Sequence, residues 1–404
     1  QAKELINNFY DTDNWKETLL KAVRLLDEAI RRDGNFALAY CWRTTAHDNL
    51  YWYGLDRTPA RLEMAQLSAE RALALVPDLG EAHLAQALIY YHSKRDYDRA
   101  LAELALANRT LPNSAEVRSL AGSIARRQGR WDDALKNLEE AVQLDPRNPK
   151  IVNGLSVVYD YLRRYDDEAA LFERAANANP STRHYSQMLR AQIELEKGDL
   201  KAARAFLDSL PADYDPDGAA TWTRITVALC ERDFDRATSV LASLKKEELV
   251  GNAGMMVPAS YWQGIIARAK GDAAGAQEAF GRARTTIEKQ LVERHDDPIL
   301  LANLGFVDAG LSRKEEAVRE GRRAVELRPL EVDADDGAIL LNTLAMIYAW
   351  IGETNAAMDQ LLFLAKTPGG PAYGQLKYDP AWDAVRGDPR FNAMLTELEP
   401  RPKK

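Results

Sequence analysis

A spacing of small, large, small and proline residues recurs along this chain with a period of 34 residues. Two successive copies are Leu138, Ala141 and Pro146, and then Phe172, Ala175 and Pro180. A period of this length with these residue types is typical of stacked helix–turn–helix units. Because each unit packs only on its neighbours, we expect one elongated core that grows with the number of repeats.

The same frame can be followed through most of the 404 residues. It consists of Ala, a large apolar residue, Ala and Pro, and its first copy has Gly34 in the proline position. The fifth copy has Glu168 where the others have their first Ala, and the frame weakens after Pro180 before it returns at Ala276. Small residues let two helices approach closely, and proline ends the second helix. We therefore predict about ten antiparallel helix pairs.

The predicted fold is an all-α, right-handed α-solenoid with a C-terminal helical cap and no strands beyond those expected by chance. The rhythm breaks at residues 48–59, 211–218 and 249–258. We divide the chain into an N-terminal array (1–210), an irregular repeat and linker (211–258), a C-terminal array (259–368), and a cap and tail (369–404). In the cap, Trp382 and Phe391 can cover the apolar face that the last repeat would otherwise expose.

The composition excludes several classes of partner. A net charge of −8 argues against binding to nucleic acid or to an anionic membrane, which requires a basic surface. The longest uncharged apolar stretch, near residues 344–351, is much shorter than the roughly 20 residues that span a bilayer. We expect no membrane insertion and a soluble protein, cytoplasmic or periplasmic, with Cys41 and Cys230 as buried thiols. The chain opens at Gln1 without an initiator Met, so we expect it to be part of a longer protein.

Several first-helix residues point to a known repeat family. They are Gly122, Leu155, Tyr159, Leu304, Gly305 and Tyr348. With these residues the units resemble tetratricopeptide repeats over nearly the whole chain, although His83 and Arg118 stand where that family prefers Trp. The resemblance implies a noncatalytic scaffold that binds proteins or peptides.

A finer resemblance rests on the runs AERALALVPDLGEAHLAQALIYYHSKRDYDRALAELALA and LKYDPAWDAVRGDPRF. Both are similar to tetratricopeptide regions at the C-terminal side of bacterial multidomain regulators, whose N-terminal parts are winged-helix, cyclase-like or Ser/Thr kinase domains. This resemblance implies a docking or sensing role in signalling. The alternative is a free-standing structural assembly or oligomerisation factor, and the oligomeric state is left open.

Two acidic strings could bind a metal ion but are better explained as linkers and helix starts. DYDPDG opens like a calcium loop, yet Arg224 stands where such a loop needs a Glu. Asp333, Asp335 and Asp336 precede a helix expected near Ala338, and carboxylates are stabilised at a helix N-terminus. The five histidines lack zinc-site spacing. The sequence therefore predicts no metal ion, no cofactor and no enzymatic activity.

The family resemblance also implies which residues face the ligand. First helices line the concave side, and positions four, seven, eleven and fourteen after the proline point into it. Counting from Pro112 gives Glu116, Ser119, Ser123 and Arg126, and counting from Pro146 gives Lys150, Asn153, Val157 and Asp160. The predicted ligand-binding residues, which include two counted from Pro180, are Arg126, Asn153, Asp160, His184 and Gln187. Solvation of an empty groove is the alternative explanation for these polar side chains.

An aromatic cluster interrupts the second repeat. Tyr51, Trp52 and Tyr53 lie in an insertion between two expected helices. Exposed aromatic residues often mark binding surfaces. A long loop can also fold its aromatic rings back onto its own repeat, so this cluster is either an interaction loop or a self-packed one.

Overall fold

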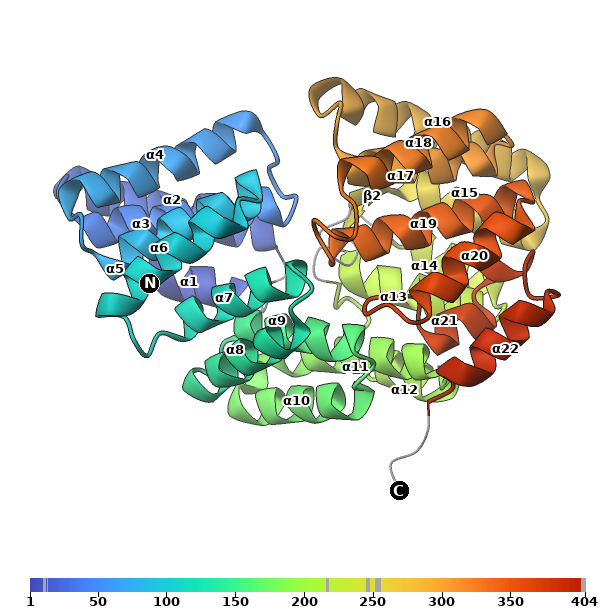
Figure 1. Ribbon diagram of the computed structural model, residues 1–404, viewed down its shortest axis with the longest axis horizontal. Coiled ribbons are helices and arrows are strands. Elements are labelled where there is room, and N and C mark those ends of the chain that lie inside the picture. The colour runs from blue at the N-terminus through green and yellow to red at the C-terminus, as the bar shows by residue number, and fades with distance from the viewer. Residues whose placement is uncertain (10–11, 13, 216–217, 245–247, 251–255, 401–404) are drawn as a thin grey trace.

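The computed structural model describes residues 1–9, 12, 14–215, 218–244, 248–250 and 256–400. Within these ranges the chain forms 22 α-helices and one pair of short strands. Successive helices form hairpins that stack side by side and curve into a superhelix (Figure 1). The predicted all-α repeat solenoid is therefore confirmed. None of the described helices combines the length and the apolar character that a membrane crossing requires.

The first five helix pairs run from α1 to α10. They are α1 (Ala2–Asn7) with α2 (Trp15–Arg32), α3 (Ala37–Trp52) with α4 (Pro59–Leu75), α5 (Gly80–Ile89) with α6 (Tyr97–Thr110), α7 (Ala115–Arg127) with α8 (Trp131–Leu144), and α9 (Pro149–Tyr161) with α10 (Tyr165–Ala178). A π-helical turn, η2 (Tyr90–Lys94), extends α5. Side-chain caps fix several helix starts: Asp96 and Ser114 accept the backbone N–H groups of Arg99 and Val117.

The remaining pairs and the cap run from α11 to α22. They are α11 (Arg183–Lys197) with α12 (Leu200–Asp208), α13 (Ala219–Cys230) with α14 (Phe234–Ala242), α15 (Ala259–Lys270) with α16 (Ala273–Glu293), α17 (Pro298–Gly310) with α18 (Lys314–Leu327), and α19 (Asp336–Ile351) with α20 (Thr354–Leu364). A short 3-10 turn, η3 (Pro180–Thr182), precedes α11. The C-terminal cap consists of α21 (Tyr373–Tyr378), η6 (Pro380–Trp382) and α22 (Pro389–Leu398).

The residues that define the repeat in the sequence are also the residues that pack between the helices. Ala134 and Ala141 are completely buried, and so is Leu138 between them. A Cβ atom on Gly122 would lie only 2.6 Å from Leu138 Cγ, so a larger residue there would push α7 away from α8. Small and large residues therefore alternate for the steric reason that the sequence pattern indicated.

One short hairpin departs from the helical plan. Strands β1 (Glu248–Val250) and β2 (Met256–Pro258) pair antiparallel, with Glu248 opposite Pro258. Two strands of three residues each are compatible with the predicted all-α fold. Leu249 and Val257 are buried in the same apolar cluster as Ile225 of α13, so the extended chain covers an apolar surface where the repeat rhythm breaks.

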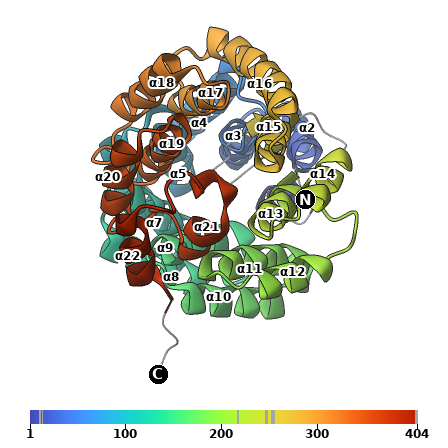
Figure 2. The same cartoon turned by 90° about the vertical axis from the view of Figure 1, so that its right-hand side faces the viewer.

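The superhelix comes back on itself after one circuit. Seen nearly end-on, the helices form a ring, with α18 to α20 on the side where α5, α7 and α9 also lie (Figure 2). Direct contacts confirm this closure: the N–H of Ala334 donates to the carbonyl of Arg127 at 2.7 Å, and the N–H of Gly369 donates to that of Tyr161 at 3.1 Å. A buried cluster also joins α1 to α3 with α11 to α13. The array is therefore a closed coil and not an open spiral.

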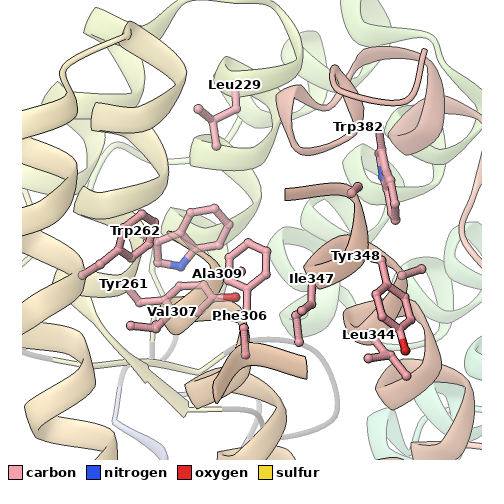
Figure 3. Close-up of a cluster of buried hydrophobic side chains, with 14 of the residues drawn as sticks. Leu229, Tyr261, Trp262, Phe306, Val307, Ala309, Leu344, Ile347, Tyr348 and Trp382 are labelled. Atoms are coloured by element: carbon pink, nitrogen blue, oxygen red, sulfur yellow. The ribbon is translucent and has the colours of Figure 1, made fainter. Parts of the chain in front are cut away.

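The largest apolar cluster lies in the C-terminal half. It extends from Leu229 and Trp262 through Phe306 to Tyr348 and Trp382 (Figure 3). Trp382 belongs to the cap, and its ring is buried beside residues of the last repeat, as the sequence predicted. The cap therefore closes the C-terminal end of the core.

Candidate ligand-binding groove

A cavity of about 520 Å³ opens between the first helices of the N-terminal pairs. Its lining comes mainly from α1, α3, α5, α7 and α9. Apolar walls are formed by Leu38 and Trp42 of α3, Leu84 and Leu88 of α5, and Leu120 of α7. Glu116, Ser119 and Ser123 of α7 and Lys150 of α9 add polar groups to the same surface. We call this cavity the N-terminal groove.

The repeat geometry explains why these residues meet. Ser114 caps α7, and Asn148 with Pro149 begins α9, so both helices start at the same position relative to the proline of their frame. Residues at equal counts from that proline then point to the same side of the array. Glu116, Ser119 and Ser123 are the positions that the count from Pro112 gives, and Lys150 is the first position counted from Pro146.

The floor of the groove holds buried polar groups with incomplete hydrogen bonding. Asn49 is fully buried; its Oδ1 accepts a hydrogen bond from Lys150 Nζ at 3.2 Å, whereas its Nδ2 has no partner among the described residues. Burial lowers the pKa of Lys150. An unpartnered buried amide is energetically costly. A ligand carbonyl at this position would complete the hydrogen bonding of Asn49.

A second polar pair lies next to Asn49. His92 Nδ1 is 2.6 Å from Asp48 Oδ2, and both side chains are buried. Burial lowers the pKa of His92, so the imidazole stays neutral near neutral pH. The ring of Trp52 stacks on His92 with a centroid distance of 4.0 Å. Trp52 therefore packs against His92, which lines the cavity, without lining it itself.

A distant segment of the chain packs against the ends of α7 and α9. The turn between α18 and α19 brings three acidic residues against α5 to α9. Together with their partners we call this contact the clasp; it comprises Arg95, Tyr97, Arg126, Arg127, Tyr161, Arg328, Asp333, Asp335 and Asp336.

Arg127 is the centre of the clasp. Its Nη1 donates to both carboxylate oxygens of Asp333, at 2.9 and 2.7 Å, and to Asp336 Oδ1 at 3.0 Å. Its Nη2 lies 3.2 Å from Asp335 Oδ2. Arg95 donates to Asp333 and Asp336 at 2.9 and 3.0 Å. These are charge-assisted hydrogen bonds in a buried setting, so they hold the two halves of the coil together.

Arg126, one of the five predicted ligand contacts, belongs to the clasp. Its Nη2 lies 2.8 Å from Asp335 Oδ2, and the hydroxyl of Tyr161 donates to Asp335 Oδ1 at 2.5 Å. Arg126 is therefore buried under a segment of its own chain. The acidic string was expected only to start a helix; it does start α19, and it also forms the clasp.

The other predicted contacts lie farther along the array. Asn153 Oδ1 accepts a hydrogen bond from the Tyr185 hydroxyl at 3.3 Å, and Asp160 lies in a cluster of carboxylates. His184 is exposed beside Tyr214, and Gln187 has a buried Oε1 without a partner among the described residues. None of the five lines the N-terminal groove, so their role as ligand contacts stays a prediction.

The aromatic residues of the second repeat pack internally. Tyr51 and Trp52 end α3, and Tyr53 caps it. The ring of Trp52, which stacks on His92, also faces two guanidinium groups: its centroid lies 5.0 Å from Cζ of Arg95 and 5.1 Å from Cζ of Arg127. The ring of Tyr53 packs against Phe9 with a centroid distance of 5.3 Å. This arrangement corresponds to the self-packed alternative; a binding role for these residues stays a prediction.

The sequence contained a signal for the groove residues that were missed. The same count of four, seven and eleven from Gly34 gives Leu38, Cys41 and Thr45, and from Pro77 it gives Glu81, Leu84 and Leu88. All six line the N-terminal groove. Extending the count to the first two frames would therefore have located the cavity.

Comparison with known proteins gives one family match and several similar solved structures. Residues 119–182 match the tetratricopeptide repeat family. No curated protein matches the chain with significance. Three solved structures are similar in fold, each at low identity. They are pilF of Pseudomonas aeruginosa (22% identity, 50% of this chain and 90% of that one, TM-score 0.38), a tetratricopeptide repeat protein of Parabacteroides merdae (16%, 66% and 98%, 0.43), and the human IFIT1 dimer with PPP-AAAA (17%, 77% and 69%, 0.44).

Proposed function

We propose that this chain, a solenoid of stacked helix pairs whose residues 119–182 match the tetratricopeptide repeat family, is a noncatalytic scaffold that binds a peptide segment of a partner protein in the N-terminal groove. Members of this repeat family are generally interaction scaffolds. The observation that carries the proposal is the cavity itself: apolar walls surround a buried amide, Asn49 Nδ2, that has no partner among the described residues. Its volume of about 520 Å³ lies within the range of about 300–1,000 Å³ typical of ligand sites.

The lining indicates what kind of segment would bind. Leu84, Leu88 and Leu120 would contact apolar side chains, and Asn49 would donate a hydrogen bond to a main-chain carbonyl. Glu116 and Lys150 carry opposite charges at the same surface, so neither an acidic nor a basic peptide is favoured by net charge alone. The groove therefore suits a short, largely apolar segment. Asn153, His184 and Gln187 remain predicted contacts for a longer ligand.

The wider role is proposed from the sequence runs near residues 69–107 and 376–391. Their similarity to tetratricopeptide regions of bacterial multidomain regulators supports a docking or sensing role within a larger regulatory protein. A DNA-binding or catalytic domain encoded upstream of residue 1 would support this role. A gene that encodes only this repeat array would favour a structural assembly factor.

Filling the groove should weaken peptide binding. We expect peptides selected from a random phage-displayed library against the wild-type protein to bind a Ser119→Trp variant at least about tenfold more weakly, which corresponds to about 1.4 kcal/mol. The indole would occupy the space beside Leu120 that the ligand needs. Fluorescence anisotropy with the labelled peptides measures the affinity.

A matched control uses the same substitution on an exposed helix. Ser239 of α14 is exposed and distant from the groove, so a Ser239→Trp variant should bind the peptides with wild-type affinity. Equal binding by both variants would place the peptide site elsewhere. Failure to select any peptide that binds the wild-type protein would contradict the proposed function.

A further inference from the structure

Three carboxylates from three consecutive helices converge beside the clasp. They are Asp160 of α9, Glu168 of α10 and Glu196 of α11, and one oxygen of each lies within 4.8 Å of the others. Glu168 is buried, whereas Asp160 and Glu196 are half-buried. Glu168 stands in the frame position where other units have a buried Ala, so the repeat geometry itself places this charge inside the array.

The cluster has buried oxygen atoms without partners. Glu168 Oε2 and Glu196 Oε2 accept no hydrogen bond from any described residue. Burial, and then repulsion from Asp160, raises the pKa values of Glu168 and Glu196. A buried carboxylate without a partner costs several kcal/mol of solvation, of the order of 2–7 kcal/mol even for an uncharged polar group. Either bound protons or a bound cation must therefore neutralise this cluster.

One positive side chain of the protein lies near the cluster but does not balance it. Burial raises the pKa of Asp160, and the nearby guanidinium of Arg163 partly opposes this rise by stabilising the carboxylate. When all three carboxyl groups are ionised, Arg163 offsets one negative charge and a divalent cation would neutralise the other two. Without a cation, Asp160 and Glu196 share a proton in a side-chain hydrogen bond.

The geometry points to a calcium-binding site formed by Asp160, Glu168 and Glu196. All three ligands are oxygen atoms, which hard cations prefer. A mutual separation of at most 4.8 Å fits within the coordination sphere of Ca²⁺, whose bonds to oxygen are about 2.3–2.6 Å long. Mg²⁺ requires a nearly ideal octahedron with shorter bonds of about 2.0–2.1 Å and keeps several waters, which a partly buried site built from three helices supplies less easily.

The site joins three repeats next to the clasp. Asp160 precedes Tyr161, the clasp residue whose hydroxyl donates to Asp335. A cation bound to Asp160 would therefore hold the C-terminal end of α9 in the position at which Tyr161 contacts Asp335. This inference does not depend on a peptide in the N-terminal groove. It predicts that calcium stabilises the coil.

Thermal unfolding with and without added metal tests the site. Protein freed of metal with EDTA should gain melting temperature when CaCl₂ is added, and less when MgCl₂ is added.

Two Glu→Gln variants of α10 separate a metal site from general effects. Glu168→Gln removes a buried charge, so in EDTA it should be at least as stable as the wild type, and it should lose the response to CaCl₂. Glu173→Gln changes an exposed residue of the same helix and should keep the response. Terbium luminescence gives a second readout, because Tyr165 lies close to the cluster and can sensitise a bound Tb³⁺ ion.

Two results would overturn the inference. The first is a wild-type protein whose melting temperature does not respond to CaCl₂, which would mean that protons alone neutralise the carboxylates. The second is an equal calcium response in the wild type and in Glu168→Gln, which would place the bound ion at another surface.

Discussion

Replacing Arg127 with Met should lower the free energy of unfolding by about 3–5 kcal/mol, because it removes the positive charge shared by three buried aspartates. Arg127 is 2% exposed, and Asp333, Asp335 and Asp336 are also buried. Burial alone would raise the pKa values of Asp335 and Asp336, but the surrounding guanidinium groups outweigh it and hold both below the ordinary value. Without Arg127, these carboxylates still lack the stabilisation that water would give them, and they also lose much of the electrostatic stabilisation that the guanidinium groups provide.

The same pKa shifts predict how the clasp responds to acid. A carboxyl group whose folded pKa is depressed stabilises the protein above its unfolded pKa, near 3.9 for Asp, and loses this contribution as the pH falls through the folded value. The clasp should therefore weaken only in acid. In the Arg127→Met variant this acid-sensitive part of the stability should be smaller.

Urea unfolding and small-angle X-ray scattering measure the two consequences of opening the clasp. The variant should have a lower urea midpoint and a larger radius of gyration, because Arg127 links α7 to α19 across the coil. The control is Arg24→Met, which breaks an ion pair to Glu17 whose side chains are 59% and 60% exposed. Such a surface pair contributes only about 0–1 kcal/mol. Equal midpoints and equal scattering for the two variants would mean that the clasp does not hold the coil closed.

The repeat architecture could be predicted because it depends on local spacing. Gly122, Leu138 and the Ala residues beside Leu138 contact one another within one helix pair or its neighbour, so their pattern in the sequence is the pattern of the core. The short pair of strands at residues 248–250 and 256–258 could not be predicted, because the repeat pattern is not continuous there. There the frame breaks, and the strands are held by an apolar surface of α13 that the repeat pattern does not encode.

The clasp could not be predicted from local spacing. Asp333 and Arg127 are 206 residues apart, and they meet only because small rotations between successive pairs add up to one circuit. In the sequence, the acidic string has all the features of an ordinary helix start, and it does serve as one: Asp333 Oδ1 accepts the N–H groups of Asp335 and Asp336. A local role that explains a motif completely can therefore conceal a second, distant role.

The candidate site was partly predictable for the same reason. The inward positions Ser119, Ser123 and Lys150 were obtained by counting from the frame, and they line the N-terminal groove. Arg126 is inward-facing too, but the distant turn that covers it has no signal in its own repeat. Glu168 was visible as a charged residue in an alanine position, yet its carboxylate partners come from neighbouring repeats and are evident only in three dimensions.

Trp382→Ala should also lower the free energy of unfolding by about 3–5 kcal/mol, the range for a buried aromatic side chain cut back to alanine. Trp382 is 2% exposed and belongs to the same apolar cluster as Leu344 and Tyr348 of α19 (Figure 3). The backbone next to it is also engaged, since Trp350 Nε1 donates to the carbonyl of Ala381 at 3.0 Å. Removing the indole leaves a cavity between the cap and the last repeat.

Chemical denaturation of the Trp382→Ala variant, beside a Phe363→Ala control, distinguishes a structural cap from a solvated tail. Phe363 is a large apolar residue of α20 that is 50% exposed, so its truncation should change the stability by about 0.5 kcal/mol or less. An unchanged midpoint for Trp382→Ala would mean that the tail adds nothing to the core.

Because Trp382 belongs to the cap and Arg127 to the clasp, with no partner in common among the described residues, the losses from Trp382→Ala and Arg127→Met should add in the double variant. A loss well above the sum would mean instead that the cap and the clasp stabilise the closed coil together.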